Sequence, residues 1–178
     1  MNRYHDTEWG VAVHDDRKIF ESLVLEGMQA GLSWMTILKK RENFRKAFDN
    51  FDPKKVSRYN ERKIRQLMAD PGIIRNRLKL SATVANARSF IAVQREFGTF
   101  DDYIWGFVKG RQIVNRWKAP GQPQARTAVS DRMSRGLKER GFRFVGSATC
   151  YSHMQATGMV NGHIVSCFRY KECSMKRT

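Results

Sequence analysis

The clearest structural signal in the chain is the stretch Leu25-Glu26-Gly27-Met28-Gln29-Ala30-Gly31-Leu32-Ser33-Trp34. Apolar residues recur at helical spacing before this stretch and again after it, so we expect helices at about residues 16–30 and 34–48. Gly31 can end the first helix with a positive φ, and Ser33 is a favourable N-cap for the second. The short turn would therefore bring an acid, an amide and an indole close together, a trio that suits a planar ligand with amino groups.

Helical patterns also dominate the rest of the chain, and strand signals are scarce. We expect about seven or eight helices in a single all-α domain. Beyond the first two, the expected helices are a short one from Asp52-Pro53, one capped by Asn60 that runs to Met68, one from Ile73 to Phe97, one near 100–108, one between Ser130 and Gly141, and one between Gly146 and Gly158. The expected core includes Leu78, Ala82, Ala85, Phe90, Trp9 and Trp105.

The charge balance is the unusual feature of the composition. The 178 residues contain 33 Lys and Arg but only 17 Asp and Glu, which gives a formal net charge of +16. Such a surplus favours a polyanionic partner, because each neutralised phosphate releases condensed counterions. A surplus that serves solubility alone and a basic membrane-surface protein are the alternatives, although no long basic amphipathic helix stands out.

Several features predict a cytoplasmic protein without a membrane span. Charged residues interrupt any apolar run near the N-terminus, so nothing there reads as a signal peptide. Residues 144–168 lack Asp, Glu, Lys and Arg, but their many polar side chains argue against a membrane helix. The three cysteines, Cys150, Cys167 and Cys173, show no disulfide spacing, which fits a reducing compartment.

Asp70-Pro71-Gly72-Ile73 lies between two expected helices and has the pattern of a helix-hairpin-helix anchor. A glycine lets the backbone approach a phosphate, and the start of the next helix offers unpaired N–H groups. Such contacts position a protein on a duplex without reading its sequence. Nearby polar side chains would add phosphate partners: Arg75, Asn76, Arg77 and Lys79. An ordinary corner between two helices is the alternative.

Six segments together resemble the DNA-3-methyladenine glycosylase I family, a bacterial branch of the helix-hairpin-helix DNA glycosylases. In order, they are Tyr4-His5-Asp6, Glu8-Trp9-Gly10, Leu25–Trp34, Leu38–Glu42, Gly72–Arg75 and Gly141–Gly146. The similarity runs from Tyr4 to about Cys167. It implies a single-domain helical bundle of that type over residues 1–168, and we expect a basic, disordered tail over 169–178.

The resemblance implies a monofunctional glycosylase that flips 3-methyladenine out of double-stranded DNA and hydrolyses its N-glycosidic bond. Such a base is cationic and leaves readily, so it needs no general acid. By resemblance Glu26 and Tyr4 are catalytic, with Glu26 accepting hydrogen bonds from the base if it is ionised. Trp34 would stack on the base, and Gln29 would line the site. The protein would act as a monomer, associated with the nucleoid and not with a membrane.

The resemblance also implies which residues contact DNA. Gly31 and Leu32 would fill the gap that the flipped base leaves, while Gly72, Ile73, Arg75 and Arg77 would bind the backbone. Many related glycosylases carry a catalytic aspartate after the hairpin, but this family does not. Asp101 and Asp102 are expected instead to cap the helix near 102–108, where carboxylates are favoured.

His163 and Cys167 are four residues apart, a spacing that suits two metal ligands, and His5 can join them. This set resembles the structural zinc clasp of the family, which uses two Cys and two His. The family's fourth ligand, an N-terminal cysteine, is absent here together with upstream aromatic residues of the pocket. Cys173 or water could replace that ligand. The alternatives are a packed cluster without metal and an impaired or non-catalytic DNA-binding relative.

Overall fold

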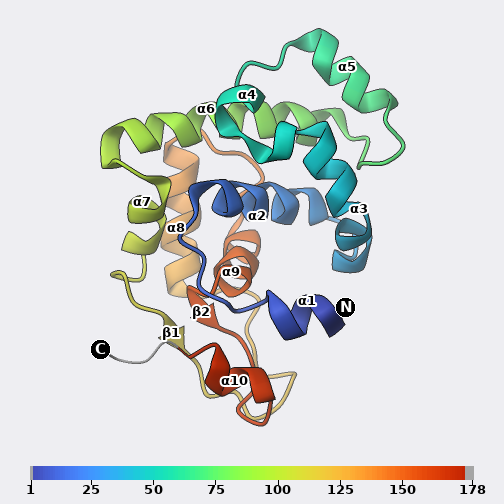
Figure 1. Ribbon diagram of the computed structural model, residues 1–178. Helices are drawn as coiled ribbons and strands as arrows, with labels where there is room; N and C mark the ends of the chain where they lie inside the picture. The colour runs from blue at the N-terminus through green and yellow to red at the C-terminus, as the bar shows by residue number, and fades with distance from the viewer. Residues whose placement is uncertain (1, 175–178) are drawn as a thin grey trace.

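The computed structural model describes residues 2–174 and is almost entirely helical (Figure 1). This confirms the all-α prediction. A two-stranded parallel sheet pairs β1 (Ile113–Val114) with β2 (Val160–Asn161). The helices are α1 (Asn2–Thr7), α2 (Asp16–Gln29), α3 (Trp34–Ala47), α4 (Pro53–Val56), α5 (Glu61–Ala69), α6 (Arg77–Phe97), α7 (Phe100–Gly106), α8 (Ala128–Glu139), α9 (Ser147–Ala156) and α10 (Phe168–Glu172), with a 3-10 turn η1 (Asp49–Phe51) after α3.

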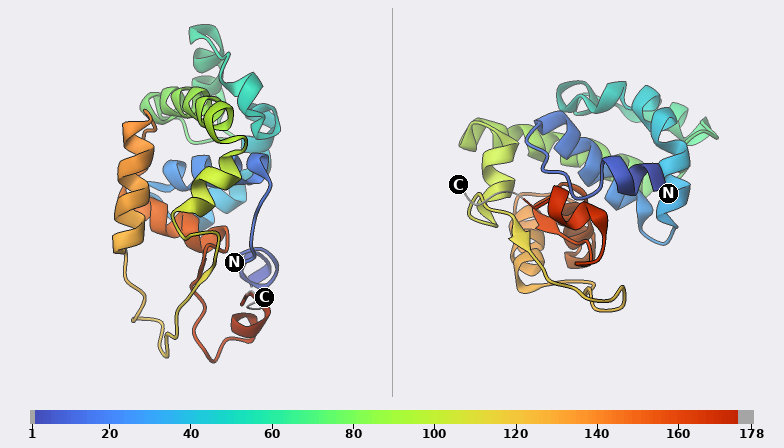
Figure 2. Two further views of the ribbon diagram at one scale, coloured as in Figure 1. Left: turned by 90° about the vertical axis from the view of Figure 1, so that its left-hand side faces the viewer. Right: turned by 60° about the horizontal axis from the view of Figure 1, so that its bottom comes forward.

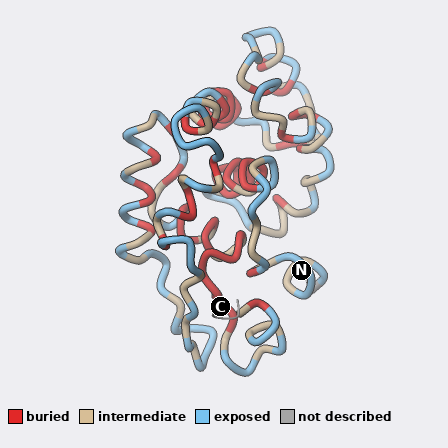
Figure 3. The backbone as a smooth tube through the Cα atoms, turned by 60° about the vertical axis from the view of Figure 1, so that its left-hand side comes forward, coloured by how far each residue is buried: buried red, intermediate tan, exposed pale blue. Residues whose placement is uncertain are grey.

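Helix α2 lies between α6 and α9 and forms the centre of the core (Figures 1 and 2). Most of its residues are buried, as the red segments of Figure 3 show for the centre of the molecule. Phe20 on α2 packs edge-on against Phe90 on α6, with ring centroids 5.1 Å apart, and Phe90 stacks on Phe100 of α7 at 4.0 Å. Rings of this size contribute much of the burial that stabilises a small domain.

The turn between α2 and α3 forms as the sequence predicts. Gly31 has a φ of +78°, and the Ser33 hydroxyl accepts a hydrogen bond from the backbone N–H of Thr36 at 3.2 Å. The turn places the last residues of α2 beside the first residue of α3. The indole of Trp34 is therefore fixed at a helix start.

Two expected helix starts and one expected cap are wrong, and the side-chain caps in the structure explain each. Helix α6 begins at Arg77, not at 73, because the Asn76 side chain caps it by accepting from the Lys79 N–H. Helix α8 is capped by Thr127, and Ser130 is its reciprocal partner in a capping box. Thr99 caps α7, so Asp101 and Asp102 lie in its first turn. Acids remain favourable there because they face the positive end of the helix dipole.

One expectation about burial and one about the C-terminal tail are also wrong. Leu78 is 75% exposed on the first turn of α6, although it was expected in the core. The expected disordered tail begins with a helix, α10, which includes Arg169. Residues 175–178 of that tail lie outside the described residues. Trp105, in contrast, is buried as expected, and its indole N–H donates to the Val13 carbonyl at 3.1 Å.

Within the described part of the chain, no helix combines the length and apolar character that crossing a membrane requires.

Candidate active site

Side chains from four helices and the segment after α1 surround a cavity of about 290 Å³, near the lower end of the range for small-molecule sites. Four residues singled out in the sequence lie together here, on α1, α2 and α3: Tyr4, Glu26, Gln29 and Trp34. The other lining residues are His5, Trp9, Ser152 and Gln155. Glu26 is the one carboxylate among the described residues that line this cavity.

Glu26 lies in the C-terminal half of α2 and is only 5% exposed. Burial raises the pKa of its carboxyl to about 8, because the charged form loses its hydration. The acid therefore holds a proton at neutral pH while the cavity is empty. A cation in the cavity would favour loss of that proton.

This shifted pKa predicts an unusual dependence of stability on pH. The folded state holds the Glu26 proton between pH 4.5 and about 8, whereas the unfolded chain releases it. The contribution of Glu26 to the free energy of unfolding therefore falls as pH rises through that window, by up to about 5 kcal/mol. In denaturant titrations across this range, Glu26→Gln should lose this component and exceed the wild-type stability most clearly near pH 8. Parallel stability curves for the two proteins would contradict the assignment.

Tyr4 and Trp34 form an aromatic wall beside Glu26. Their ring centroids are 5.6 Å apart, with the planes tilted by 53°. Burial and, to a smaller extent, the nearby Glu26 carboxyl raise the pKa of the Tyr4 phenol. The phenol is therefore neutral and keeps its proton as a hydrogen-bond donor. An acid, a phenol donor and an indole face thus surround one small space, an arrangement suited to a flat, electron-poor ring.

Three further lining residues were not identified from the sequence. Ser152 and Gln155 lie three positions apart on one face of α9, a signal that helical spacing alone could have provided. Trp9, which was expected in the core, is only partly buried and lines the cavity instead. Its ring lies edge-on to His163, with centroids 4.5 Å apart.

An ion-pair network holds the segment that carries Tyr4. Arg41 on α3 donates from Nε to the Glu21 carboxylate on α2 at 2.6 Å and from Nη1 to Glu8, just after α1. Arg45 also donates to Glu21. One guanidinium thus connects three consecutive segments around the cavity, and a wider groove of about 960 Å³ lies alongside, sharing Tyr4 and Trp34 in its lining.

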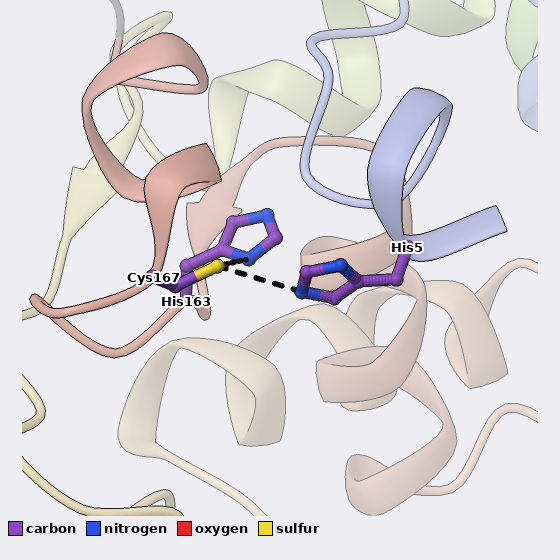
Figure 4. A group of neighbouring side chains, drawn as sticks. All are labelled: His5, His163 and Cys167. Carbon is purple, nitrogen blue, oxygen red and sulfur yellow. Dashed lines mark hydrogen bonds between the residues drawn. The ribbon is translucent and has the colours of Figure 1, made fainter. Parts of the chain in front are cut away.

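His5, His163 and Cys167 lie together beside this cavity (Figure 4), with their ligand atoms all within 4.8 Å of one another. Cys167 Sγ lies 3.6 Å from both His5 Nε2 and His163 Nδ1. The outer nitrogens of both rings are also engaged: His5 Nδ1 meets Asp6 Oδ1 at 2.8 Å, and His163 Nε2 meets the Trp9 carbonyl at 3.2 Å. Such outer contacts orient metal-binding imidazoles.

Cys173 does not join this cluster. Its thiol points to the Trp9 carbonyl at 3.8 Å, near the Nε2 side of the His163 ring, whereas the Nδ1 atom faces Cys167. The expectation that Cys173 could supply a fourth ligand therefore does not fit this geometry. Among the residues that the structure describes, the cluster offers three ligand atoms.

The hairpin between α5 and α6 is built as a tight corner. The Gly72 N–H donates to Asp70 Oδ1 at 2.7 Å, and Lys40 Nζ donates to the Pro71 carbonyl at 2.8 Å. A side chain at position 72 would place its Cβ 2.9 Å from that Asp70 oxygen, so a larger residue would have to displace the Asp70 side chain that holds the corner. The Gly72 amide is therefore already used within the corner.

The side chains of the hairpin differ in what they can offer to a phosphate. Ile73 is only 3% exposed, so its side chain belongs to the core and only its backbone could touch DNA. Arg75 is exposed, while Arg77 is exposed but paired with Glu61. Lys79 is buried and points inward, contrary to the expectation that it would meet a phosphate. Gly31 and Leu32, on the turn before α3, are both exposed.

Comparison with known proteins places this arrangement among enzymes that remove damaged bases. The chain belongs to the methyladenine glycosylase family, whose model matches residues 1–170. It is 47% identical over 167 residues to DNA-3-methyladenine glycosylase 1 of Escherichia coli K12, covering 94% of this chain and 89% of the relative. It is 46% identical over 164 residues to the DNA-3-methyladenine glycosylase of Haemophilus influenzae, covering 92% and 89%.

Solved structures agree with this family assignment. A 3-methyladenine DNA glycosylase I in complex with 3-methyladenine superposes with a TM-score of 0.94 at 32% identity, covering 99% of this chain and 93% of the other. The helix-hairpin-helix bundle expected from the sequence is thus confirmed.

Proposed function

We infer that this protein is a DNA glycosylase that hydrolyses the N-glycosidic bond of 3-methyladenine in alkylated DNA, the first step of base excision repair. One observation carries the inference: a carboxyl group is buried beside a phenol and an indole in a cavity of about 290 Å³. The family membership of the chain and the names of its relatives support the same activity.

The chemistry requires little from acid or base catalysis. Flipping the base out of the duplex costs a few kcal/mol, and the pocket recovers this by binding the extruded base. A 3-methylated adenine is positively charged, so it interacts favourably with ionised Glu26 and with the face of Trp34. When the bond between C1′ of the sugar and N9 of the base breaks, its electron pair moves to the base and cancels the positive charge. Water then bonds to C1′ and gives up a proton.

We propose that the reaction stops at base release, without cleavage of the DNA strand. Strand cleavage by a glycosylase needs an amine that forms a Schiff base with the sugar. Among the described residues, no lysine lines the cavity, and the buried Lys79 ammonium is bound to backbone carbonyls.

Tyr4 is positioned to donate a hydrogen bond in the pocket and Gln29 to contact the base edge.

We further propose that the protein binds double-stranded DNA as a monomer, in the bacterial cytoplasm and in association with the nucleoid. One chain supplies all eight residues that line the cavity, so a partner subunit is not needed to complete it. The net charge of +16 and the exposed Arg75 and Arg77 suit a phosphate backbone. Gly31 and Leu32 are exposed beside the cavity, where they can fill the gap left by the flipped base.

Release of free base from methylated duplex DNA tests this proposal. The purified protein should liberate 3-methyladenine from DNA treated with a methylating agent, and nothing from untreated DNA. The DNA strand should remain intact until the abasic site is cleaved by alkali. Tight binding to methylated DNA without base release would identify instead a non-catalytic relative.

His5, His163 and Cys167 suit a structural zinc ion, and we propose that they hold one. Two imidazoles and a thiol are ligands that zinc prefers, and Asp6 and the Trp9 carbonyl orient the rings from outside. Bound there, the ion would tie α1 to the segment before α10. Water could complete the coordination. Because His5 also lines the cavity, the ion would hold one wall of the pocket in place.

Metal analysis of the purified protein should find about one zinc ion per chain, and Cys167→Ser should remove it. Chelation should lower the melting temperature by about 4 °C or more. This shift corresponds to a loss of about 1–2 kcal/mol in the free energy of unfolding, because 1 kcal/mol corresponds to about 2–4 °C in a domain of this size. Cys173→Ser is the matched control and should keep its zinc. Substoichiometric zinc after mild dialysis would favour a packed cluster without metal.

A further inference from the structure

Lys79 makes an unusual pair of contacts for a lysine. It lies in the first turn of α6, is only 8% exposed, and donates from Nζ to the backbone carbonyls of Met28 at 2.8 Å and Ala30 at 2.6 Å. Both carbonyls belong to the C-terminal end of α2, where the last carbonyls of a helix have no partner within the helix. The ammonium therefore caps the end of a different helix.

The contact is electrostatically specific. The C-terminal end of a helix carries partial negative charge, so a cation is favoured there, and charge-assisted hydrogen bonds are stronger than neutral ones. Burial lowers the pKa of the Lys79 ammonium, which reflects the cost of removing it from water. An uncharged side chain at this position would leave the two carbonyls without this donor.

The two ends of this link lie in different functional regions. Lys79 comes three residues after Asn76, whose side chain caps α6 at the end of the hairpin. Ala30 directly precedes Gly31 and Leu32, the exposed residues beside the cavity. A single side chain thus connects the hairpin that we assign to phosphate binding with the loop that we assign to gap filling.

We propose that Lys79 is a positioning residue that fixes the Gly31–Leu32 loop relative to the hairpin, so that docking of the hairpin on the phosphate backbone places the loop to drive base extrusion. This inference rests on the proposed glycosylase function. It separates two steps: Lys79 serves extrusion of the base from the duplex, whereas Glu26 and Trp34 serve recognition of the base once it is in the pocket.

Lys79→Met keeps the length and apolar stem of the side chain but removes its donors. We expect single-turnover excision from methylated duplex DNA to fall by about 10-fold or more, because a small misplacement of a positioning element costs rate steeply. Affinity for free 3-methyladenine, measured by calorimetry, should change by less than about 2-fold, because the pocket residues are untouched. Fluorescence of 2-aminopurine placed next to the lesion should show reduced extrusion.

Lys54→Met removes the same charge from an exposed position on α4 and should behave as the wild type in all three assays. Lys79→Arg keeps donors but has a broader head group, so it should fold, bind the free base normally and show an intermediate loss of extrusion. If Lys79→Met does not fold, the Lys79→Arg variant tests the proposal by the same comparison of excision with affinity for the free base.

Excision by Lys79→Met at the wild-type rate would overturn the proposal. Equal losses of free-base affinity and excision, in the Met or the Arg variant, would overturn it as well, because Lys79 would then support the pocket itself. Failure of the proposed function is distinguishable: the wild-type protein would release no base, while the affinity and extrusion assays would still report on Lys79.

Discussion

Replacing Glu26 with glutamine should reduce excision of 3-methyladenine by about 20-fold at pH 7. Two unit charges about 5 Å apart attract each other by about 3 kcal/mol at an effective dielectric constant near 20. Removing the Glu26 proton, whose pKa in the empty cavity is about 8, offsets about 1.4 kcal/mol of this attraction at pH 7. The remaining attraction of about 2 kcal/mol corresponds to about 20-fold, since 1.4 kcal/mol corresponds to about a factor of ten. Glutamine keeps the size of the side chain and one oxygen acceptor but cannot carry the negative charge. Single-turnover release of the base from methylated duplex DNA measures the effect.

A control separates loss of the active carboxyl from loss of any acid. Glu139→Gln changes an exposed glutamate on α8 and should leave excision unchanged. The Glu26→Gln protein should also be folded, since its neutral side chain suits the buried position. Excision at the unmutated rate by folded Glu26→Gln would show that the assignment of Glu26 is wrong.

The affinity for undamaged duplex DNA should fall steeply with salt. If about four phosphates are neutralised, raising the salt from about 50 to 200 mM weakens binding by about 150-fold, because each contact releases condensed counterions. Fluorescence anisotropy of a labelled duplex at several salt concentrations gives the slope of the logarithm of the binding constant against the logarithm of the salt concentration. The large positive charge and the exposed arginine at the hairpin motivate this expectation.

One variant at the hairpin tests how much a single arginine contributes to that slope. Arg75→Ala should reduce the slope by about one and weaken binding similarly for all sequences, as expected for a phosphate contact. Arg132→Ala removes an exposed arginine from α8, away from the hairpin, and should leave the slope unchanged. A flat salt titration of the wild-type protein would count against the basic surface as a DNA-binding face.

The sequence predicted the elements that have strong local signals. Helices α2 and α3 and the turn between them follow from apolar spacing, Gly31 and Ser33. The short helices α1 and α10 were not predicted, since a helix of five or six residues depends on tertiary contacts for its stability. The start of α6 was misplaced because the extended segment before it also contains apolar residues.

Contacts between distant parts of the chain were the main limit for the site. Glu26 and Trp34 lie eight positions apart, so a local turn brings them together. The Lys79 side chain points inward because its ammonium donates to the carbonyls of Met28 and Ala30, about fifty residues earlier in the chain. The local sequence around a basic residue cannot reveal such a contact. The cavity position of Trp9 likewise depends on α9 and on His163, which come late in the chain.

The walls of the cavity come from the two ends of the polypeptide, Tyr4 to Trp34 on one side and Ser152 and Gln155 on the other. During synthesis the N-terminal helices leave the ribosome first. More than a hundred further residues must emerge before α9 can close the remaining side. A nascent chain that stops short of α9 would therefore carry the acid and the indole on an open surface, with no enclosed binding site for a base.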